Sequence, residues 1–238
     1  LDLASIFTTH WPRFAATHRH LLTAAHYKAA RAVMACRTAV LGGEVHHCGD
    51  CAGEKRYVYH SCNHRSCLKC GGREQKEWAA AQEAKLLPRV PYFMLTFTIP
   101  EELRRFAYRE QAWFYDAMFK AAAETLIDFA HDEKHLGGTP GFTAVLHTWT
   151  RQMQQHPHLH VIIPGIALSA DGLRVRRSKA KKYLFPIAAL AAAFRHRLDK
   201  AILHRDTVEH TRHYSQIDPQ VWKKPWIVDA RAVGRAVT

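Results

Sequence analysis

The sequence predicts an α+β protein in which a small cysteine-rich helical module precedes a larger domain of helices packed on a mostly antiparallel sheet. Five of the six cysteines crowd between Cys48 and Cys70, in a stretch with few large aliphatic residues. After Pro91 the chain becomes strongly apolar, and strand-like and helix-like patterns follow one another to its end. We therefore expect two domains, at residues 1–88 and 89–238.

Apolar periodicity assigns the main elements in order along the chain. An Ala-rich run over residues 21–34 has helical spacing and ends before Gly42-Gly43. The β-branched and aromatic run 92–99, bounded by prolines, predicts a buried strand. The remaining expected elements are a long helix over 101–129, antiparallel strands at 142–149 and 158–164, a hairpin around Asp171-Gly172, a second long helix over 187–202 and a final strand at 226–228.

The chain is strongly basic. Lys and Arg total 34 against 21 for Asp and Glu, which gives a formal net charge of +13 and a pI near 9.7. This surplus attracts polyanions and makes nucleic acid the leading candidate partner, although many basic proteins only carry solvated positive faces. We see no secretory signal, and the longest apolar run, 187–194, is too short to cross a bilayer. We therefore expect a cytoplasmic protein with no membrane partner.

Four cysteines form two C-x-x-C pairs, Cys48 with Cys51 and Cys67 with Cys70, separated by fifteen residues. This spacing is typical of zinc sites, in which two such pairs complete a tetrahedron of thiolates. A site with four thiolates has no open position for substrate, so we predict a zinc-ribbon-like module with structural Zn²⁺. Cys62 is a possible further ligand. The alternative is a set of reduced structural cysteines without metal.

Other residues around this module have less specific patterns. Cys36 lies at the end of the predicted helix, where an ordinary buried cysteine is the favoured interpretation. A non-ligand role is favoured for His60 and His64, which lie beside Cys62. A basic surface for DNA docking, or else a solvated basic rim, is expected from Lys55, Arg56, Arg65, Lys69 and Arg73.

His158-Leu159-His160 opens an apolar strand-like run. On a strand the two imidazoles point to the same face while Leu159 faces the core, which makes a partial ligand set for a divalent cation. If the neighbouring strand pairs with Arg151 opposite His158, His147 falls on the same face and is the candidate third ligand. Alternatives for this ligand are Gln152, Gln154 or a residue from elsewhere in the chain.

Two further stretches suit contact with DNA. The first is a basic run just after the expected hairpin, which either tracks a DNA backbone or forms an exposed loop. Its members are Arg174, Arg176, Arg177, Lys179, Lys181 and Lys182. The second, Trp222 to Trp226, interleaves cations with aromatic rings as in base stacking, although a core position is favoured for Trp226.

Several of these motifs, in this order, resemble the rolling-circle transposases of the insertion sequence 91 family. The segments that carry the resemblance are 36–38, 41–43, the C-x-x-C pair 48–51, 61–70, 91–100, 146–149 and 156–160. The resemblance implies a zinc-binding N-terminal domain joined to an HUH endonuclease domain. It also implies that the protein associates with the nucleoid in the cytoplasm. It also implies that a tyrosine cleaves single-stranded DNA at transposon ends, leaving a 5′-phosphotyrosine and a free 3′-hydroxyl. His158 and His160 would then hold a catalytic Mg²⁺ or Mn²⁺.

In this family the nucleophilic tyrosines lie on a helix soon after the strand that here reads 228–235. We expect that helix beyond Thr238, so that this chain is truncated and binds DNA and metal without cutting. Neither Tyr183 nor Tyr214 lies in the family's tyrosine motif. Two other functions stay open: a zinc-stabilised DNA-binding remnant without catalysis, and a metal-dependent phosphoesterase that uses water as its nucleophile.

Overall fold

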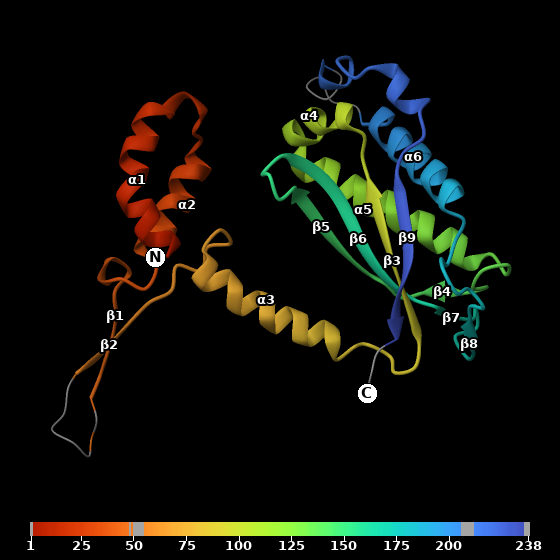
Figure 1. The fold of residues 1–238 in the computed structure, drawn as a ribbon, viewed down its shortest axis with the longest axis horizontal. Helices are drawn as coiled ribbons and strands as arrows, with labels where there is room; N and C mark the ends of the chain where they lie inside the picture. The colour runs from red at the N-terminus through yellow and green to blue at the C-terminus, as the bar shows by residue number, and fades with distance from the viewer. Residues whose placement is uncertain (1, 48, 50–54, 206–211, 236–238) are drawn as a thin grey trace. The chain divides into compact units, whose positions relative to one another are not determined.

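The computed structural model describes residues 2–47, 49, 55–205 and 212–235. The chain divides into two compact units, Leu1–Leu86 and Leu87–Thr238, whose elements are labelled in Figure 1. None of the helices within the described ranges combines the length and the apolar character needed to cross a membrane.

The N-terminal unit combines helices with a small antiparallel hairpin. Its elements are α1 (Leu3–Thr17), η1 (Arg19–Leu21), α2 (Ala24–Ala35), η2 (Ala39–Leu41), β1 (Gly43–His46), β2 (Arg56–Tyr59) and α3 (Leu68–Glu83). Helix α2 corresponds to the predicted Ala-rich helix, whereas α1 lies outside the sequence prediction. The carboxylate of Asp2 accepts a hydrogen bond from the Ser5 amide at the start of α1. Trp11 of α1 contacts Tyr27 of α2, which holds the two helices together.

The C-terminal unit contains the main sheet. Its elements are β3 (Pro91–Thr98), α4 (Glu101–Arg109), α5 (Gln111–His131), β4 (Thr139–Pro140), β5 (Thr143–Trp149), β6 (Gln155–Pro164), β7 (Ile166–Leu168), β8 (Val175–Arg177), α6 (Ile187–Leu203), η3 (Pro219–Trp222) and β9 (Val228–Arg235). The main sheet has the order β5-β6-β3-β9, and each neighbouring pair is antiparallel. A smaller sheet has the order β4-β7-β8. These features confirm the predicted α+β class with an antiparallel sheet.

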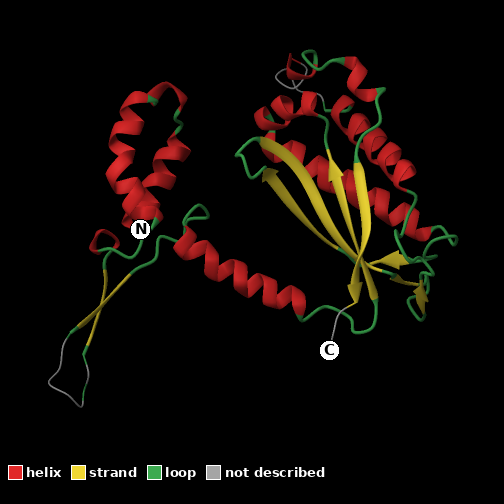
Figure 2. Cartoon of the chain, viewed as in Figure 1, coloured by secondary structure: helices red, strands yellow, loops and turns green. Residues whose placement is uncertain are grey.

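The two faces of the main sheet differ in burial. On β3 and β6 every second residue is fully buried in the core that the sheet forms with the helices: Phe93, Leu95, Phe97, Leu159, Val161 and Ile163. Figures 1 and 2 show α5 and α6 on one side of this sheet. The residues between the buried ones are only half-buried, so the opposite face remains accessible. We call it the open face.

The prediction of one long helix over 101–129 is wrong, because the helix is interrupted at Glu110, which separates α4 from α5. The Glu110 carboxylate is 7% exposed and contacts Arg205 at 2.8 Å and His213 at 2.9 Å. Phe106 and Phe114 meet edge to face across the break. Apolar residues continue at helical spacing on both sides of Glu110, which is why periodicity did not predict the bend.

The remaining predictions largely agree with the structure. The hairpin around Asp171-Gly172 joins β7 to β8, and α6 covers the second predicted helix. The final strand was expected at 226–228, but β9 runs from Val228 to Arg235. Trp226 lies just before it, buried against Phe194 as expected for a core residue.

Candidate metal centres

Three histidines converge on the open face of the main sheet. His158 and His160 extend from β6, and His147 extends from the neighbouring strand β5. Their ring centroids lie 4.6 to 5.2 Å apart, and one nitrogen of each ring lies within 4.8 Å of the others. His147 is exposed and the other two rings are half-buried, so a cation held between them could still contact a substrate.

Strand register explains the convergence. The expected pairing of Arg151 with His158 is wrong, because His147 lies opposite His158. Strand β6 begins at Gln155, and the turn before it is tight, with the Thr150 amide donating to the Gln154 carbonyl at 2.9 Å. The partner of His158 is therefore four residues earlier than expected. An even shift leaves His147 on the face where it was expected, since side chains alternate along a strand.

Hydrogen bonds orient the rings on β6. His158 Nδ1 lies 2.7 Å from the His156 carbonyl oxygen, to which it donates in the tautomer that leaves Nε2 free as a ligand. His160 Nδ1 lies 3.0 Å from the hydroxyl of Thr96 on β3. Thr96 lies directly opposite His160, and sequence reasoning missed it because only the β3–β6 register brings the two together.

The pKa values of His147 and His160 are lowered, which favours their neutral form. Burial, followed by the nearby His158, lowers the pKa of His147. Burial also lowers the pKa of His160, with smaller contributions from His158, His147 and Arg231. Neutral imidazole is the form that binds metal, so the donor set fits a divalent cation at neutral pH.

Four cysteines of the N-terminal unit form a second cluster. The Cys36 and Cys70 sulfurs lie 3.5 Å apart, and the Cys62 and Cys70 sulfurs lie 3.7 Å apart. With Cys67, all four sulfurs lie within 4.8 Å of one another. Four sulfurs bound at about 2.3 Å to one tetrahedral ion lie roughly 3.8 Å apart, so the cluster has the dimensions of a Zn²⁺ site.

The environment of the thiols differs within this cluster. Burial raises the pKa of Cys36, and it raises the pKa of Cys62 to about 12. Burial also acts to raise the pKa of Cys70, but hydrogen bonds from its neighbours, first among them Cys36, bring it down to about 7. Because the ligand form is the thiolate, a Zn²⁺ ion in the cluster would compensate the burial of this charge.

The composition of the cluster differs from the expected pairing of two C-x-x-C motifs. Cys67 and Cys70 are in it, and so is Cys62, which was expected only as a possible ligand. Cys48 and Cys51 lie outside the described residues. Cys36 is fully buried, as expected of an ordinary core cysteine, but its sulfur faces the other three.

The basic residues expected to contact DNA fall into two groups. Four of them lie in ion pairs: Lys69 with Asp2, Arg73 with Glu77, Arg174 with Asp171 and Arg176 with Glu133. The others are exposed: Lys55, Arg56 and Arg65 in the N-terminal unit, Arg177 at the end of β8, and Lys179, Lys181 and Lys182 after it.

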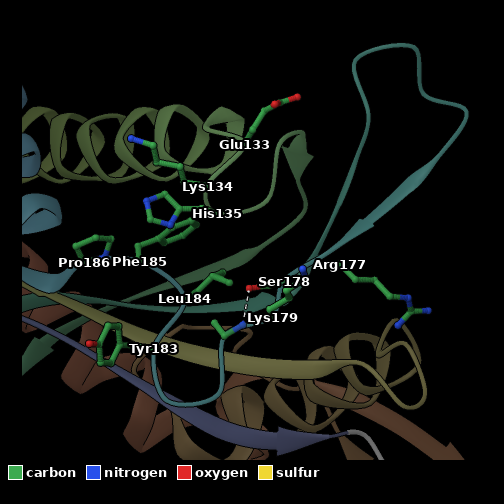
Figure 3. Close-up of a pocket in the computed structure, with 11 residues that line it drawn as sticks. Glu133, Lys134, His135, Arg177, Ser178, Lys179, Tyr183, Leu184, Phe185 and Pro186 are labelled. Atoms are coloured by element: carbon green, nitrogen blue, oxygen red, sulfur yellow. Dashed lines mark hydrogen bonds between the residues drawn. The ribbon is translucent and has the colours of Figure 1, made fainter.

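A cavity of about 440 Å³ lies beside the connection from β8 to α6. Its lining includes Phe185, His135 and Lys179. Figure 3 shows Arg177, at the rim, extending away from His135 and Phe185. The guanidinium of Arg177 is therefore directed away from the aromatic wall of this cavity.

Two families match the chain. Residues 6–99 match the transposase zinc-binding domain family, and residues 141–237 match a family described as putative transposase. A putative transposase of Sinorhizobium fredii, y4qJ, is 39% identical over 194 residues, which cover 82% of this chain and 48% of that protein. The transposase for insertion sequence element IS801 of Pseudomonas savastanoi pv. phaseolicola is 32% identical over 142 residues, covering 59% of this chain and 33% of that protein. The chain thus spans half or less of the length of these relatives.

Two solved structures show a weaker likeness. The conjugative relaxase TrwC in complex with oriT DNA, in a metal-free structure, aligns with a TM-score of 0.36 and 20% identity, covering 49% of this chain and 47% of that chain. TrwC complexed with a 27-mer DNA gives the same TM-score and identity, covering 49% and 48%.

Proposed function

Because the chain belongs to the insertion sequence 91 family of transposases, we propose that it carries the zinc-binding module and the metal site of a DNA transposase. In its full-length form this enzyme cleaves single-stranded DNA at transposon ends and rejoins it. The observation that carries the proposal is the set of three imidazoles on the open face, at His147, His158 and His160.

In this proposal the three histidines hold one divalent cation, either Mn²⁺ or Mg²⁺. The bound ion would withdraw charge from the scissile phosphate and orient it for displacement. Three nitrogen donors favour Mn²⁺, because Mg²⁺ prefers oxygen ligands and keeps much of its water. Thr96 fixes the ring of His160, and the His156 carbonyl fixes the ring of His158.

The reaction proposed for the full-length form is a transesterification. A tyrosine oxygen bonds to phosphorus while the bond from phosphorus to the 3′ oxygen breaks, which leaves a 5′-phosphotyrosine and a free 3′-hydroxyl. The energy of the broken bond is kept in the covalent adduct, so a 3′-hydroxyl can later attack it and rejoin the DNA without ATP.

The N-terminal unit has a docking role in this proposal. Its cysteine cluster holds a structural Zn²⁺, since four thiolates leave no position for substrate. The folded module then presents cations to the DNA phosphates. The proposed contacts are Arg56, Arg65, Lys69 and Arg73 in this unit, with Arg174, Arg176, Arg177, Lys181 and Lys182 in the C-terminal unit.

Metal binding tests the histidine site on this chain directly. Calorimetric titration with Mn²⁺ should show one exchangeable site that is lost in the double variant His158→Ala, His160→Ala. The matched control is His156→Ala, which removes the next imidazole on the same face of β6 but none of the three ligands. Equal Mn²⁺ affinity in the double variant and the wild type would exclude this site.

Cleavage is tested with a full-length form and a labelled single-stranded oligonucleotide. The wild type should nick the strand and form a covalent protein–DNA adduct in Mn²⁺, and the double variant should do neither. Cleavage without an adduct would show that water is the nucleophile. Binding of metal and DNA without any cleavage would show that the protein is a DNA-binding remnant.

A further inference from the structure

Five cations surround one cavity of the C-terminal unit, which we call the basic trough. Its volume is about 510 Å³, and Pro91 and Gly165 form part of its wall. The cations come from the segment before β3, the end of β8, the connection from β8 to α6 and the end of β9. They are Arg89, Arg177, Lys179, Lys181 and Arg235, and none of the described residues lining the trough is acidic.

Among the described residues, no carboxylate pairs with the cations of the trough. Arg174 and Arg176 belong to the same basic run, but they pair with Asp171 and Glu133. Within the ranges that the structure describes, none of the five trough cations forms an ion pair. Like charges gathered around one cavity repel one another, and a bound anion removes that repulsion. The trough therefore has the electrostatics of an anion site.

The wall of the trough is held by backbone hydrogen bonds. The Ser178 amide donates to the Gly165 carbonyl at 2.9 Å, and the Ala232 amide donates to the Lys182 carbonyl at 2.9 Å. These bonds attach the segment 178–182 to the end of β6 on one side and to β9 on the other. The cations are thus mounted on a fixed backbone rather than on a free loop.

The trough and the histidines lie at opposite ends of the main sheet. Thr96 pairs with His160, and Pro91 of the same strand lines the trough. Five residues of strand separate them, or about 17 Å. Arg231 on β9 lies between the two ends, in the row of Met94 on the open face. Pro91 alternates with Phe93 and so faces the helix side of the sheet, which makes about 17 Å the shortest path. At roughly 3.4 Å per phosphate of a stacked strand, this path corresponds to at least about five nucleotides.

We infer that the basic trough binds backbone phosphates of the same single DNA strand that is held at the histidines, at least about five nucleotides from the scissile position. The identity of this strand rests on the proposed function, whereas phosphate binding in the trough needs neither the metal nor cleavage. The trough would thus set the direction in which the strand leaves the histidine site.

Binding of a fluorescein-labelled 12-nucleotide oligothymidylate, followed by fluorescence anisotropy without added metal, tests this inference. The trough variant is Lys179→Gln, Lys181→Gln, and both side chains are exposed, so the fold should persist. The matched control, Lys120→Gln, Lys200→Gln, removes the same charge from the helical side of the unit. Each lost phosphate contact lowers the salt slope for a single strand by about 0.7 and the affinity at 0.1 M salt by roughly fivefold. We expect the affinity for the oligonucleotide to fall about 25-fold in the trough variant and less than twofold in the control.

Three results would overturn the inference. The first is wild-type affinity in the trough variant, and the second is an equal loss in both double variants, which would reflect only the diffuse field of the protein. The third is thymidine monophosphate binding as tightly as the 12-mer, which would make the trough a nucleotide site. The same affinity measurements in a His158→Ala, His160→Ala background separate phosphate binding in the trough from metal binding at the histidines. The loss of affinity caused by the trough variant should keep its size when the metal site is absent.

Discussion

Replacing Cys36 with serine tests most directly which cysteines hold the structural zinc. The Cys36 sulfur is fully buried and lies 3.5 Å from that of Cys70, within the cluster completed by Cys62 and Cys67. Serine fills nearly the same space but supplies no thiolate. Structural zinc sites contribute about 10–16 kcal/mol, so an even share for one of four ligands is roughly 2.5–4 kcal/mol. The expected loss of zinc affinity is therefore about 70- to 900-fold.

Competition with a chromophoric chelator in reducing buffer measures this affinity. The matched variant is Cys48→Ser, which removes a cysteine that the C-x-x-C spacing predicts as a ligand. We expect Cys36→Ser to weaken the tightest zinc and Cys48→Ser to leave it unchanged. Wild-type affinity in Cys36→Ser, combined with a large loss in Cys48→Ser, would refute the reasoning and restore the pairing of the two C-x-x-C motifs.

Three further predictions concern the C-terminal unit. Leu159→Ala should lower the free energy of unfolding by about 3–5 kcal/mol in urea titrations, because Leu159 is fully buried in the core on the face of β6 opposite to the ligand histidines. A loss below about 1 kcal/mol would contradict its place in the core. Thr96→Val should weaken Mn²⁺ binding by about 10- to 100-fold, because it removes the hydroxyl that orients the ring of His160. Thr98→Val, the same change on the same strand, should leave Mn²⁺ binding unchanged, and equal effects of the two variants would refute the orienting role of Thr96. Burial lowers the pKa of His147 and His160 in the folded chain. As the pH falls through about 6.5, these two groups therefore bind more protons in the unfolded chain than in the folded chain. The free energy of unfolding should consequently fall as the pH drops from about 7.5 to about 5.5. Urea midpoints should show a flatter pH dependence when both histidines are changed to Gln, and an unchanged slope would show that other groups carry the acid sensitivity.

Local patterns in the sequence were enough to predict which of the main segments are helices and which are strands. The run 92–99 is β-branched and aromatic, and it forms β3; the apolar spacing over 187–202 forms α6. These patterns succeed because alternation and helical spacing reflect which side of one element is buried. The break at Glu110 escaped them, because its cause is a carboxylate that contacts Arg205 and His213, about a hundred residues away.

For the candidate sites too, some features followed from the sequence and others only from the tertiary structure. The sequence alone determined that His158 and His160 share one face of a strand, since that follows from the two-residue repeat of any strand. It also determined that the N-terminal module is rich in thiols. Only the tertiary structure decided that His147 lies opposite His158 and that Cys36 joins Cys62, Cys67 and Cys70. Register and cluster membership depend on contacts between segments distant in the chain, whose energies no local spacing encodes.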